Sequence, residues 1–315
     1  MRAVRFHEYG DPQVLRVEDV DRPEPGTGQV RIRVAGTTFN GVDGNIRAGL
    51  MQDPMPLSLP HVPGVDVAGT VDALGDGVDD IAVGDRVVGF LPFVDDGAAA
   101  EFVLAPAQIL SPAPTTIPLA DAAALPVVGL TALQALVDHA GLRAGQRILI
   151  NGAGGAVGNY AVQLAASVGA HVIATAGPNS RSRVEAAGAD EIIDHTTTDV
   201  IDAVTQPVDV LLNLASIDPD RFAALATLVA DGGVVVNTTV WMPVPTDADR
   251  GVRGVDMYVR SDAAQLAELV ARVDRGELIV DVAERVSLTG LVDVHTRAAQ
   301  GKVSGKIVVV VDPSV

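Results

Sequence analysis

The chain has 315 residues, no cysteine and a formal net charge of −18, from 40 acidic and 22 basic residues. The lack of cysteine excludes disulfides, thiol nucleophiles and thiolate metal sites. The negative charge would repel a phosphate backbone, so we expect no nucleic-acid partner. No apolar run approaches the roughly 20 uncharged residues that span a bilayer, and the N-terminus lacks a signal-peptide pattern. We therefore expect a cytoplasmic protein with no membrane partner.

Short strand patterns separated by proline and glycine occupy residues 1 to about 115. They read RVEDV, QVRIRVAGT, VAGTVDAL, DRVVGF and AEFVLA. This pattern predicts a compact β domain. The six histidines, at 7, 61, 139, 171, 195 and 295, are too scattered to place a His-x-x-x-His pair on one helix face. We therefore expect no zinc site.

Strands alternate with helices after residue 120. We predict strands at 147–151, 171–176, 191–193, 208–212 and 233–237, and helices near 157–168, 181–187, 198–204 and 220–230. Such alternation predicts a doubly wound parallel sheet, so the fold class is α/β. Residues 241–256 resemble a long irregular connection, which often borders a site. Beyond 260 an amphipathic helix and a last strand, KIVVVVD, are expected to pack back on the other parts.

A glycine-rich turn follows the predicted strand RILIN. Gly152, Gly155 and Gly158 are spaced Gly-x-x-Gly-x-x-Gly, with Val157 where the usual third glycine would fall. Backbone N–H groups at such a turn, including those of Ala156 and Val157, bind a pyrophosphate at the start of a helix. The strand before the turn and the helix after it favour dinucleotide binding over a bare packing turn.

The charge after the second predicted strand of this region indicates which dinucleotide is bound. Proteins that prefer NAD commonly place a carboxylate there, about 20 residues past the glycines. Here no carboxylate precedes Glu185, whereas Arg181 and Arg183 are positioned to bind a 2′-phosphate. NADPH is therefore the predicted cofactor. The alternative is that both arginines are ordinary residues on an exposed helical turn.

Segments along nearly the whole chain resemble one family. They are FNGVDGNIRAG at 39–49, LPHVPGVDVAGTVDALGDGV at 59–78, VGDRVVGF at 83–90, AAALPVVGLTALQAL at 122–136, the glycine turn, GADEIID at 188–194 and GKVSGKIVVVVD at 301–312. The chain resembles the zinc-free quinone oxidoreductase branch of the medium-chain dehydrogenases and reductases. The resemblance implies a GroES-like catalytic domain, residues 1–119 completed by 261–315, and a Rossmann domain, residues 120–260.

Further expectations follow only from this resemblance. It implies a nicotinamide cleft between the two domains, with Thr131 and Lys306 reaching it. His195 stands where relatives often carry a tyrosine near the 2′-phosphate. The resemblance also implies a homodimer joined through sheet edges, and residues 234–240 could form such an edge or a buried strand. The residues expected along the cofactor are Asn213, Leu214, Thr238 and Val240.

The metal ligands of zinc-dependent relatives have no counterpart here. Where those relatives carry a cysteine and a His-Glu pair, this chain has Asn40 and the pair Val65 and Asp66. A metal-free site points to acceptors that are already electron-poor, such as quinones or α,β-unsaturated carbonyls. Asn40 is the predicted donor to the developing negative charge, or else a turn residue bonded to its own backbone. Asp43 is expected to tie down the same loop.

Two other functions remain open. Enoyl-thioester reduction would require a broad acyl channel. A non-catalytic sensor or scaffold would keep the NADPH site without turnover, since no side chain is identified as a general acid.

Overall fold

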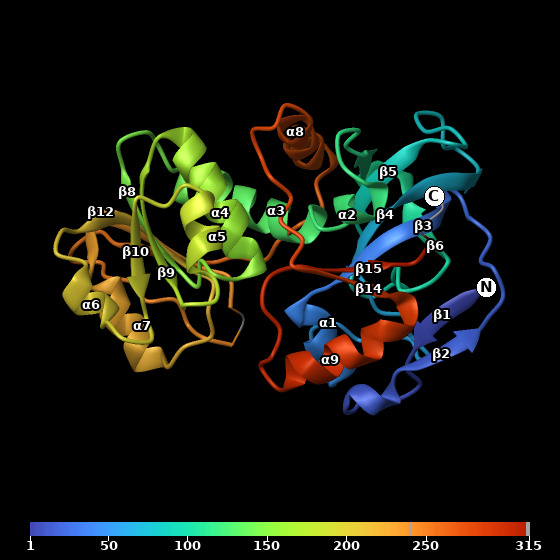
Figure 1. Cartoon of the computed structure of the whole chain (residues 1–315), viewed down its shortest axis with the longest axis horizontal. Coiled ribbons are helices and arrows are strands. Elements are labelled where there is room, and N and C mark those ends of the chain that lie inside the picture. Colours follow the sequence, from blue (N-terminus) through green and yellow to red (C-terminus); the bar gives the residue numbers. More distant parts are fainter. Residues whose placement is uncertain (240, 313–315) are drawn as a thin grey trace. The chain divides into compact units, whose positions relative to one another are not determined.

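The computed structural model describes residues 1–239 and 241–312 and divides the chain into two compact units (Figure 1). The first comprises Met1–Val127 with Ser261–Val315, and the second comprises Val128–Arg260. This boundary lies beyond the one expected at 119, because helix α2 (Leu119–Ala122) packs on strands of the first unit.

The first unit is built on a seven-stranded sheet, most of whose neighbours are antiparallel. Its path is β14 (Glu284–Ser287), β15 (Ile307–Val310), β3 (Gln29–Phe39), β4 (Asp66–Leu74), β5 (Arg86–Phe90) and β7 (Leu110–Pro112), with β6 (Phe102–Pro106) also paired to β3. A separate ribbon joins β1 (Arg2–Arg5) to β2 (Arg16–Asp19). Alternating apolar residues of β3 and β4, such as Ile32, Val34 and Val67, fill the core of the seven-stranded sheet.

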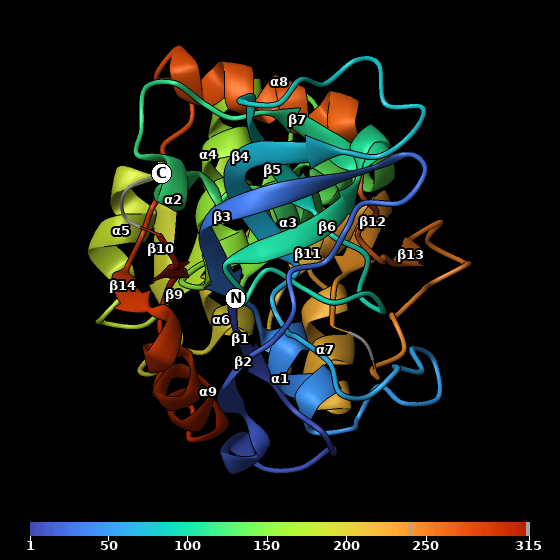
Figure 2. The ribbon, with the colours of Figure 1, turned by 90° about the vertical axis from the view of Figure 1, so that its right-hand side faces the viewer.

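Helices cover this sheet and its ends. They are α1 (Gly41–Arg47), α2, α8 (Ala263–Asp274), α9 (Leu291–Ala299) and the short 3₁₀ turns η1 (Pro12–Val14), η2 (Ala107–Ile109) and η4 (Leu288–Gly290). Figure 2 shows α8 beside β7 and α9 beside the helix α1. The C-terminal strand β15 pairs with β3, with Ile307 opposite Phe39 and Val308 opposite Thr38. The chain's last strand is therefore part of the same sheet as β3, which lies near the start of the chain.

The second unit holds a six-stranded parallel sheet, which confirms the predicted doubly wound architecture. The strand order is β10 (Glu191–Asp194), β9 (His171–Ala176), β8 (Arg147–Asn151), β11 (Val208–Asn213), β12 (Val229–Asn237) and β13 (Arg253–Asp256). Helices α4 (Ala156–Val168) and α5 (Arg181–Ala186) pack against β8, β9 and β10, and α6 (Val200–Ala203) and α7 (Pro219–Ala226) lie over the other face (Figure 1). Strand order reverses between β8 and β11, where such folds bind ligands.

Two sequence-based expectations for this unit need correction, and one open alternative is decided. Residues 241–256 are not wholly irregular, because they contain β13, whose short segment RGVD has no apolar run that could signal a strand. The predicted helix 220–230 ends earlier, since α7 stops at Ala226 and β12 starts at Val229. Strand β12 lies between β11 and β13, so residues 234–237 are an interior strand and not an edge.

One helical stretch of the described chain, Leu119–Ala140, has the length and composition of a membrane span. It includes α2, α3 (Pro126–Leu133) and the π-helical segment η3 (Gln134–Ala140). Within the fold, 89% of its apolar window is buried, which is typical of a core helix in a globular protein.

Candidate active site and cofactor turn

The glycine turn lies between β8 and α4, at the point where the strand order reverses. Gly152 has φ +88°, a conformation that side chains disfavour. Gly155 is the N-cap of α4, and it has no side chain to cap the first-turn N–H groups of Ala156 and Val157. At Gly158 an added Cβ would lie 2.4 Å from the carbonyl oxygen of Ala153. Gly152 therefore allows the bend, Gly155 leaves the N-terminus of the helix open, and Gly158 allows the helix to pack closely on the turn.

Hydrogen-bonded side chains cross the carboxyl edge of the parallel sheet in one direction. The Thr175 hydroxyl donates to Asn151 Oδ1 at 3.1 Å, and Asn151 Nδ2 donates to Asn213 Oδ1 at 2.8 Å. Asn213 Nδ2 donates to Asn237 Oδ1 at 3.0 Å, and Asn237 Nδ2 donates to Asp256 Oδ1 at 2.9 Å. We call this run of five residues the amide chain. Each asparagine is the last residue of its strand, so parallel register brings them together.

The amide chain is tied to the glycine turn, because the Gly152 N–H donates to the Thr175 hydroxyl at 2.8 Å. The predicted cofactor residues at the strand ends either belong to the amide chain or bond the backbone of its members. Asn213 is fully buried, and its carbonyl accepts from the N–H and hydroxyl of Thr238. Leu214 donates its N–H to the Asn151 carbonyl. These residues lie at the carboxyl edge of the parallel sheet, while Val240 falls outside the described residues.

The residues predicted near a 2′-phosphate gather beside the end of β10. Arg181 begins α5, and a Cβ added at Gly177, just after β9, would lie 3.7 Å from His195 Nε2. The pKa of Asp194 is lowered chiefly by hydrogen bonds from Thr196, with smaller electrostatic contributions from nearby His195 and Arg181. The carboxylate of Asp194 therefore lies near Arg181, although the two residues are not close in the sequence.

Arg183 lies half-buried on the same helix, and Arg181 is exposed. Thr131, predicted near the nicotinamide, is 7% exposed within α3.

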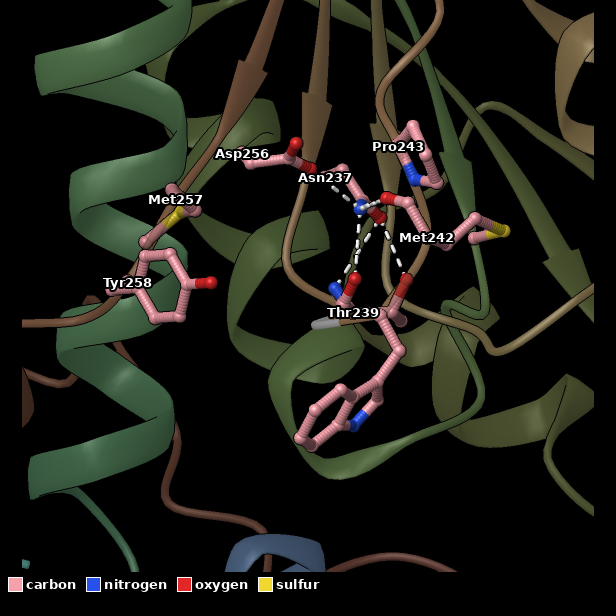
Figure 3. Close-up of a pocket in the computed structure, with 8 residues that line it drawn as sticks. Asn237, Thr239, Met242, Pro243, Asp256, Met257 and Tyr258 are labelled. Atoms are coloured by element: carbon pink, nitrogen blue, oxygen red, sulfur yellow. Dashed lines mark hydrogen bonds between the residues drawn. The ribbon is translucent and has the colours of Figure 1, made fainter. Parts of the chain in front are cut away.

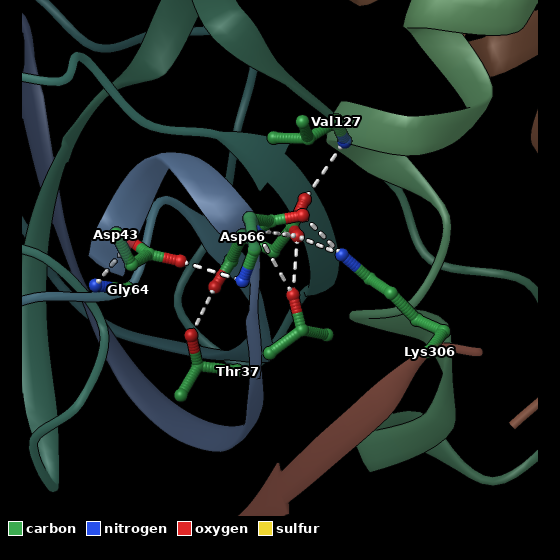
Figure 4. Close-up of polar contacts among 8 residues, drawn as sticks. Thr37, Asp43, Gly64, Asp66, Val127 and Lys306 are labelled. Atoms are coloured by element: carbon green, nitrogen blue, oxygen red, sulfur yellow. Dashed lines mark hydrogen bonds and ion pairs between the residues drawn. The ribbon is translucent and has the colours of Figure 1, made fainter. Parts of the chain in front are cut away.

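A buried cluster of charged and polar groups forms where β3 ends, β4 begins and β15 begins (Figure 4). The Lys306 ammonium donates to Asn40 Oδ1 and, at 3.0 Å, to Asp66 Oδ2. The Thr38 hydroxyl donates to the same Asp66 oxygen. Lys306 is 2% exposed and Asp66 fully buried. Because Ile307 pairs with Phe39, strand register places Lys306 next to Asn40. We call these residues, with Asp43, the lysine cluster.

Backbone N–H groups complete the lysine cluster. Asp66 Oδ1 accepts from the N–H of Val127, near the start of α3, at 2.8 Å. Asp43 accepts from the N–H groups of Asn40, at 2.8 Å, and of Gly64, at 3.2 Å. Burial, aided by the charge of nearby Asp66, raises the pKa of Asp43 to about 6. Asp43 thus holds the loop around Asn40, the role expected for it.

The amide of Asn40 is already engaged within the protein. Its Nδ2 donates to Asp66 Oδ2 at 2.9 Å and to the Thr38 hydroxyl at 3.3 Å. A substrate that accepts from Asn40 must therefore replace the longer contact, to Thr38. Lys306 likewise bonds partners in its own unit. The sequence did not indicate the contact between Asn40 and Thr38. This contact forms because the two side chains, two residues apart in the chain, both bond the carboxylate of Asp66.

Comparison with known proteins identifies the family. Residues 26–115 match the alcohol dehydrogenase GroES-like domain, and residues 187–309 match a zinc-binding dehydrogenase domain. A chloroplast envelope quinone oxidoreductase homolog of Arabidopsis thaliana is 32% identical over 325 residues, covering 98% of each chain. The chain belongs to the quinone oxidoreductase branch of the medium-chain dehydrogenase and reductase superfamily.

Solved structures agree with this quinone oxidoreductase assignment. The quinone oxidoreductase of Coxiella burnetii matches with a TM-score of 0.89 at 27% identity, over 99% of both chains. A mycobacterial protein solved as a complex with NADPH matches with a TM-score of 0.85 at 27% identity, over 98% of this chain and all of the other. The chain is thus a quinone-oxidoreductase-like enzyme.

Zinc, which the second family match implies by its description, does not fit the residues of this chain. Among the described residues no three His, Cys, Asp or Glu side chains lie close enough to hold a metal ion. At the lysine cluster, an ammonium group already bonds the buried carboxylate of Asp66. A cation paired in this way, beside a neutral amide, is not a zinc donor set.

Proposed function

We propose that this quinone oxidoreductase relative oxidises NADPH and passes hydride to quinones or α,β-unsaturated carbonyls without a metal. The observation that carries the proposal is the glycine turn, whose open helix end lies where the strand order of a parallel sheet reverses. The NADPH bound by the mycobacterial structural relative supports the choice of cofactor.

The residues of the turn fit a dinucleotide. The N–H groups of Ala156 and Val157 would bind the pyrophosphate, since the N-cap Gly155 adds neither bulk nor a competing acceptor. Arg181 and His195, gathered near Asp194, would bind the 2′-phosphate that distinguishes NADPH from NADH. Bound NADPH would supply the hydride.

The lysine cluster defines the acceptor chemistry. Without a metal, the acceptor itself must be electron-poor, and the protein contributes fixed donors and the exclusion of water. The Lys306 ammonium on Asn40 Oδ1 fixes the orientation of that amide, so its N–H groups face Asp66 and Thr38. We propose that Asn40 donates to the developing negative charge in place of its contact to Thr38.

The loss of NADPH absorbance in the near ultraviolet tests this function. Benzoquinone, phenanthrenequinone, a small enone and crotonyl-CoA are offered in turn, and we expect oxidation with the quinones and the enone. Faster turnover with crotonyl-CoA would instead indicate an enoyl-thioester reductase. Binding of NADPH without oxidation by any acceptor would indicate a sensor or scaffold.

Substitution of Asn40 tests its part in the reaction. We expect Asn40→Ala to lower kcat by at least about tenfold with little change in the KM for NADPH, because a donor used in the transition state is lost. Asn45→Ala, on the same helix α1, is the matched control. A kcat within about twofold of the wild type would leave Asn40 only its structural role.

We further propose a cytoplasmic homodimer that acts on small molecules. The sheet of the second unit ends in β10 and β13, so either edge strand would be available for pairing. Light scattering during gel filtration measures the mass, and a monomer at micromolar concentration would refute the dimer.

A further inference from the structure

The first unit contains a hollow of its own, separate from the one that borders Asn237 and Asp256 at the sheet edge of the second unit (Figure 3). It has a volume of about 460 Å³ and is lined by residues at the end of β3, along α1, and along α9 and the loop after it. Helices α1 and α9 pack against each other there (Figure 2). His295 of α9 and Arg47 of α1 both line this hollow, which we call the histidine hollow.

The imidazole of His295 is buried without a hydrogen bond. It is 1% exposed, and neither Nδ1 nor Nε2 has a partner among the described residues. The ring packs edge-to-face on Phe39, with the ring centres 4.8 Å apart. Burial, aided by the charge of Arg47, lowers the pKa of His295 to about 3, so the ring is neutral and carries one N–H donor and one acceptor. Buried polar atoms almost always have partners, so two without any indicate a missing one.

Arg47 is a buried cation without a counter-ion. Its side chain is 5% exposed, its Nε has no partner, and in the part of the chain that the structure describes no carboxylate forms an ion pair with it. Its Nη1 donates to the Gly10 carbonyl. Burial lowers the pKa of Arg47, and the charge of Asp11 only partly opposes this. Because buried charges in folded proteins are normally paired, the position of Arg47 indicates an anion.

We propose that the histidine hollow binds a small monocarboxylate with an apolar body. Arg47 would supply the opposite charge and the Nε–H donor, and the neutral imidazole of His295 would donate to the second carboxylate oxygen. The three unpartnered nitrogens are shielded from water, so both side chains would turn toward the ligand as it binds. A half-turn of the imidazole exchanges its nitrogens with ring carbons and keeps its shape, which would bring a nitrogen to the ligand.

The wall of the histidine hollow fits an apolar body. Helix α1 and its C-cap contribute Gly41, Gly44 and Ala48, which share one face of the helix, and α9 contributes Ala298 and Ala299. These small residues leave room between the two helices, and the volume lies in the range of small-molecule sites.

The charge of the histidine hollow fits a monoanion. Arg47 is the only cation among the described residues that line it. A phosphate dianion would bring a second negative charge that no lining cation balances, and burying such a charge is costly. A carboxylate brings one charge and two acceptor oxygens, which match one guanidinium and one imidazole N–H.

Titration of benzoate into nitrogen-15-labelled protein tests the site, because imidazole resonances respond to new hydrogen bonds. We expect saturable shifts of the His295 ring resonances, which are assigned by their absence in His295→Phe. Benzamide has the same shape without the charge, and we expect it to bind at least about tenfold more weakly. The dissociation constant for benzoate should be the same with and without saturating NADP⁺, since the proposed site is separate from the glycine turn.

Thermal unfolding with and without benzoate tests the part of Arg47. A ligand that binds only the folded state raises the Tm, so benzoate should stabilise the wild type. We expect this rise to be lost in Arg47→Met, which removes the charge and the Nε donor, and to be weakened in His295→Phe. Arg16→Met, which removes an exposed arginine of the same unit, is the control and should keep the full rise.

Three results would overturn the proposal. They are the absence of saturable shifts with benzoate, equal binding of benzoate and benzamide, and competition between benzoate and NADP⁺, which would place the carboxylate at the cofactor turn. Inorganic phosphate that binds as tightly as benzoate would overturn the choice of a monocarboxylate. If Arg47→Met does not fold, the titrations of the wild type still decide between these outcomes. No readout depends on turnover, so the site is tested separately from the proposed function.

Discussion

At the sheet edge of the second unit the buried polar side chains are neutral amides that donate in one direction, whereas the lysine cluster of the first unit holds full charges. The amide chain ends on Asp256, which is exposed, so its one carboxylate remains hydrated. The lysine cluster buries both Lys306 and Asp66 almost completely. Forming the amide chain requires little desolvation of charged groups, whereas forming the lysine cluster requires a great deal.

The difference shows how each network depends on its members. Neutral hydrogen bonds contribute modestly, and losing one leaves a polar group without a partner. A buried charge that loses its partner is far more costly, because it has neither water nor a counter-ion. We therefore expect large losses from single changes in the lysine cluster and smaller ones in the amide chain.

Removing the ammonium group should have the largest effect. Lys306→Met leaves the carboxylate of Asp66 uncompensated, and we expect the free energy of unfolding to fall by about 3–5 kcal/mol. Urea denaturation followed by circular dichroism measures it. Lys302→Met changes the chain's other lysine, which is exposed, and is the control. Adding Asp66→Asn to Lys306→Met should recover part of the loss, and no recovery would show that burial of charge is not its cause.

The raised pKa of Asp43 predicts a pH dependence of stability. The native state binds this proton more tightly than the unfolded chain, so the contribution of Asp43 is complete below pH 3.8 and is lost as the pH rises through about 6. A shift of this size corresponds to about 3 kcal/mol. Asp43→Asn cannot titrate, so the stability of the wild type relative to this variant should fall by that amount as the pH rises from 3.5 to 7.

Unfolding measured in urea at several pH values tests this expectation, with the exposed carboxylate of Asp53 removed by Asp53→Asn as the control. A difference between wild type and Asp43→Asn that does not vary with pH would contradict it. The pH dependence would then have to arise outside the lysine cluster.

The sequence predicted the features that have local signals. The glycine turn was predicted because strand, glycines and helix follow one another within residues 147–168, and the parallel sheet because strands and helices alternate. Strand β13 was missed, since the segment RGVD carries neither apolar alternation nor enough length. Local sequence patterns thus predicted the parallel architecture of the second unit but not β13, its last strand.

Contacts that depend on strand order were not predictable in the same way. The amide chain joins residues at or near the ends of β9, β8, β11, β12 and β13, which are adjacent only once the sheet has formed. Asparagine at the end of several predicted strands was the available signal. Lys306 was placed near the site only by family resemblance, and its pairing with Asn40 follows from the register of β15 on β3.

A smaller effect is expected at the start of the amide chain. Thr175→Val keeps the shape of the side chain but leaves the Gly152 N–H and Asn151 Oδ1 each without a bond, and we expect a loss of about 2 kcal/mol. Thr198→Val, at an exposed position of the same unit, is the control. A loss as large as that of Lys306→Met would contradict the distinction between neutral and charged networks.

The smallest effect on stability, and a clear effect on cofactor choice, is expected from the two arginines of α5. Arg181→Ala with Arg183→Ala should raise the KM for NADPH far more than the KM for NADH, because only NADPH carries the 2′-phosphate. Arg181 lies close enough to affect the pKa of Asp194, so we expect Arg181→Ala alone to account for most of the change. Steady-state rates with each coenzyme measure the two constants. Equal effects on NADPH and NADH would show that the arginines are ordinary surface residues, and the 2′-phosphate would then have to be recognised elsewhere.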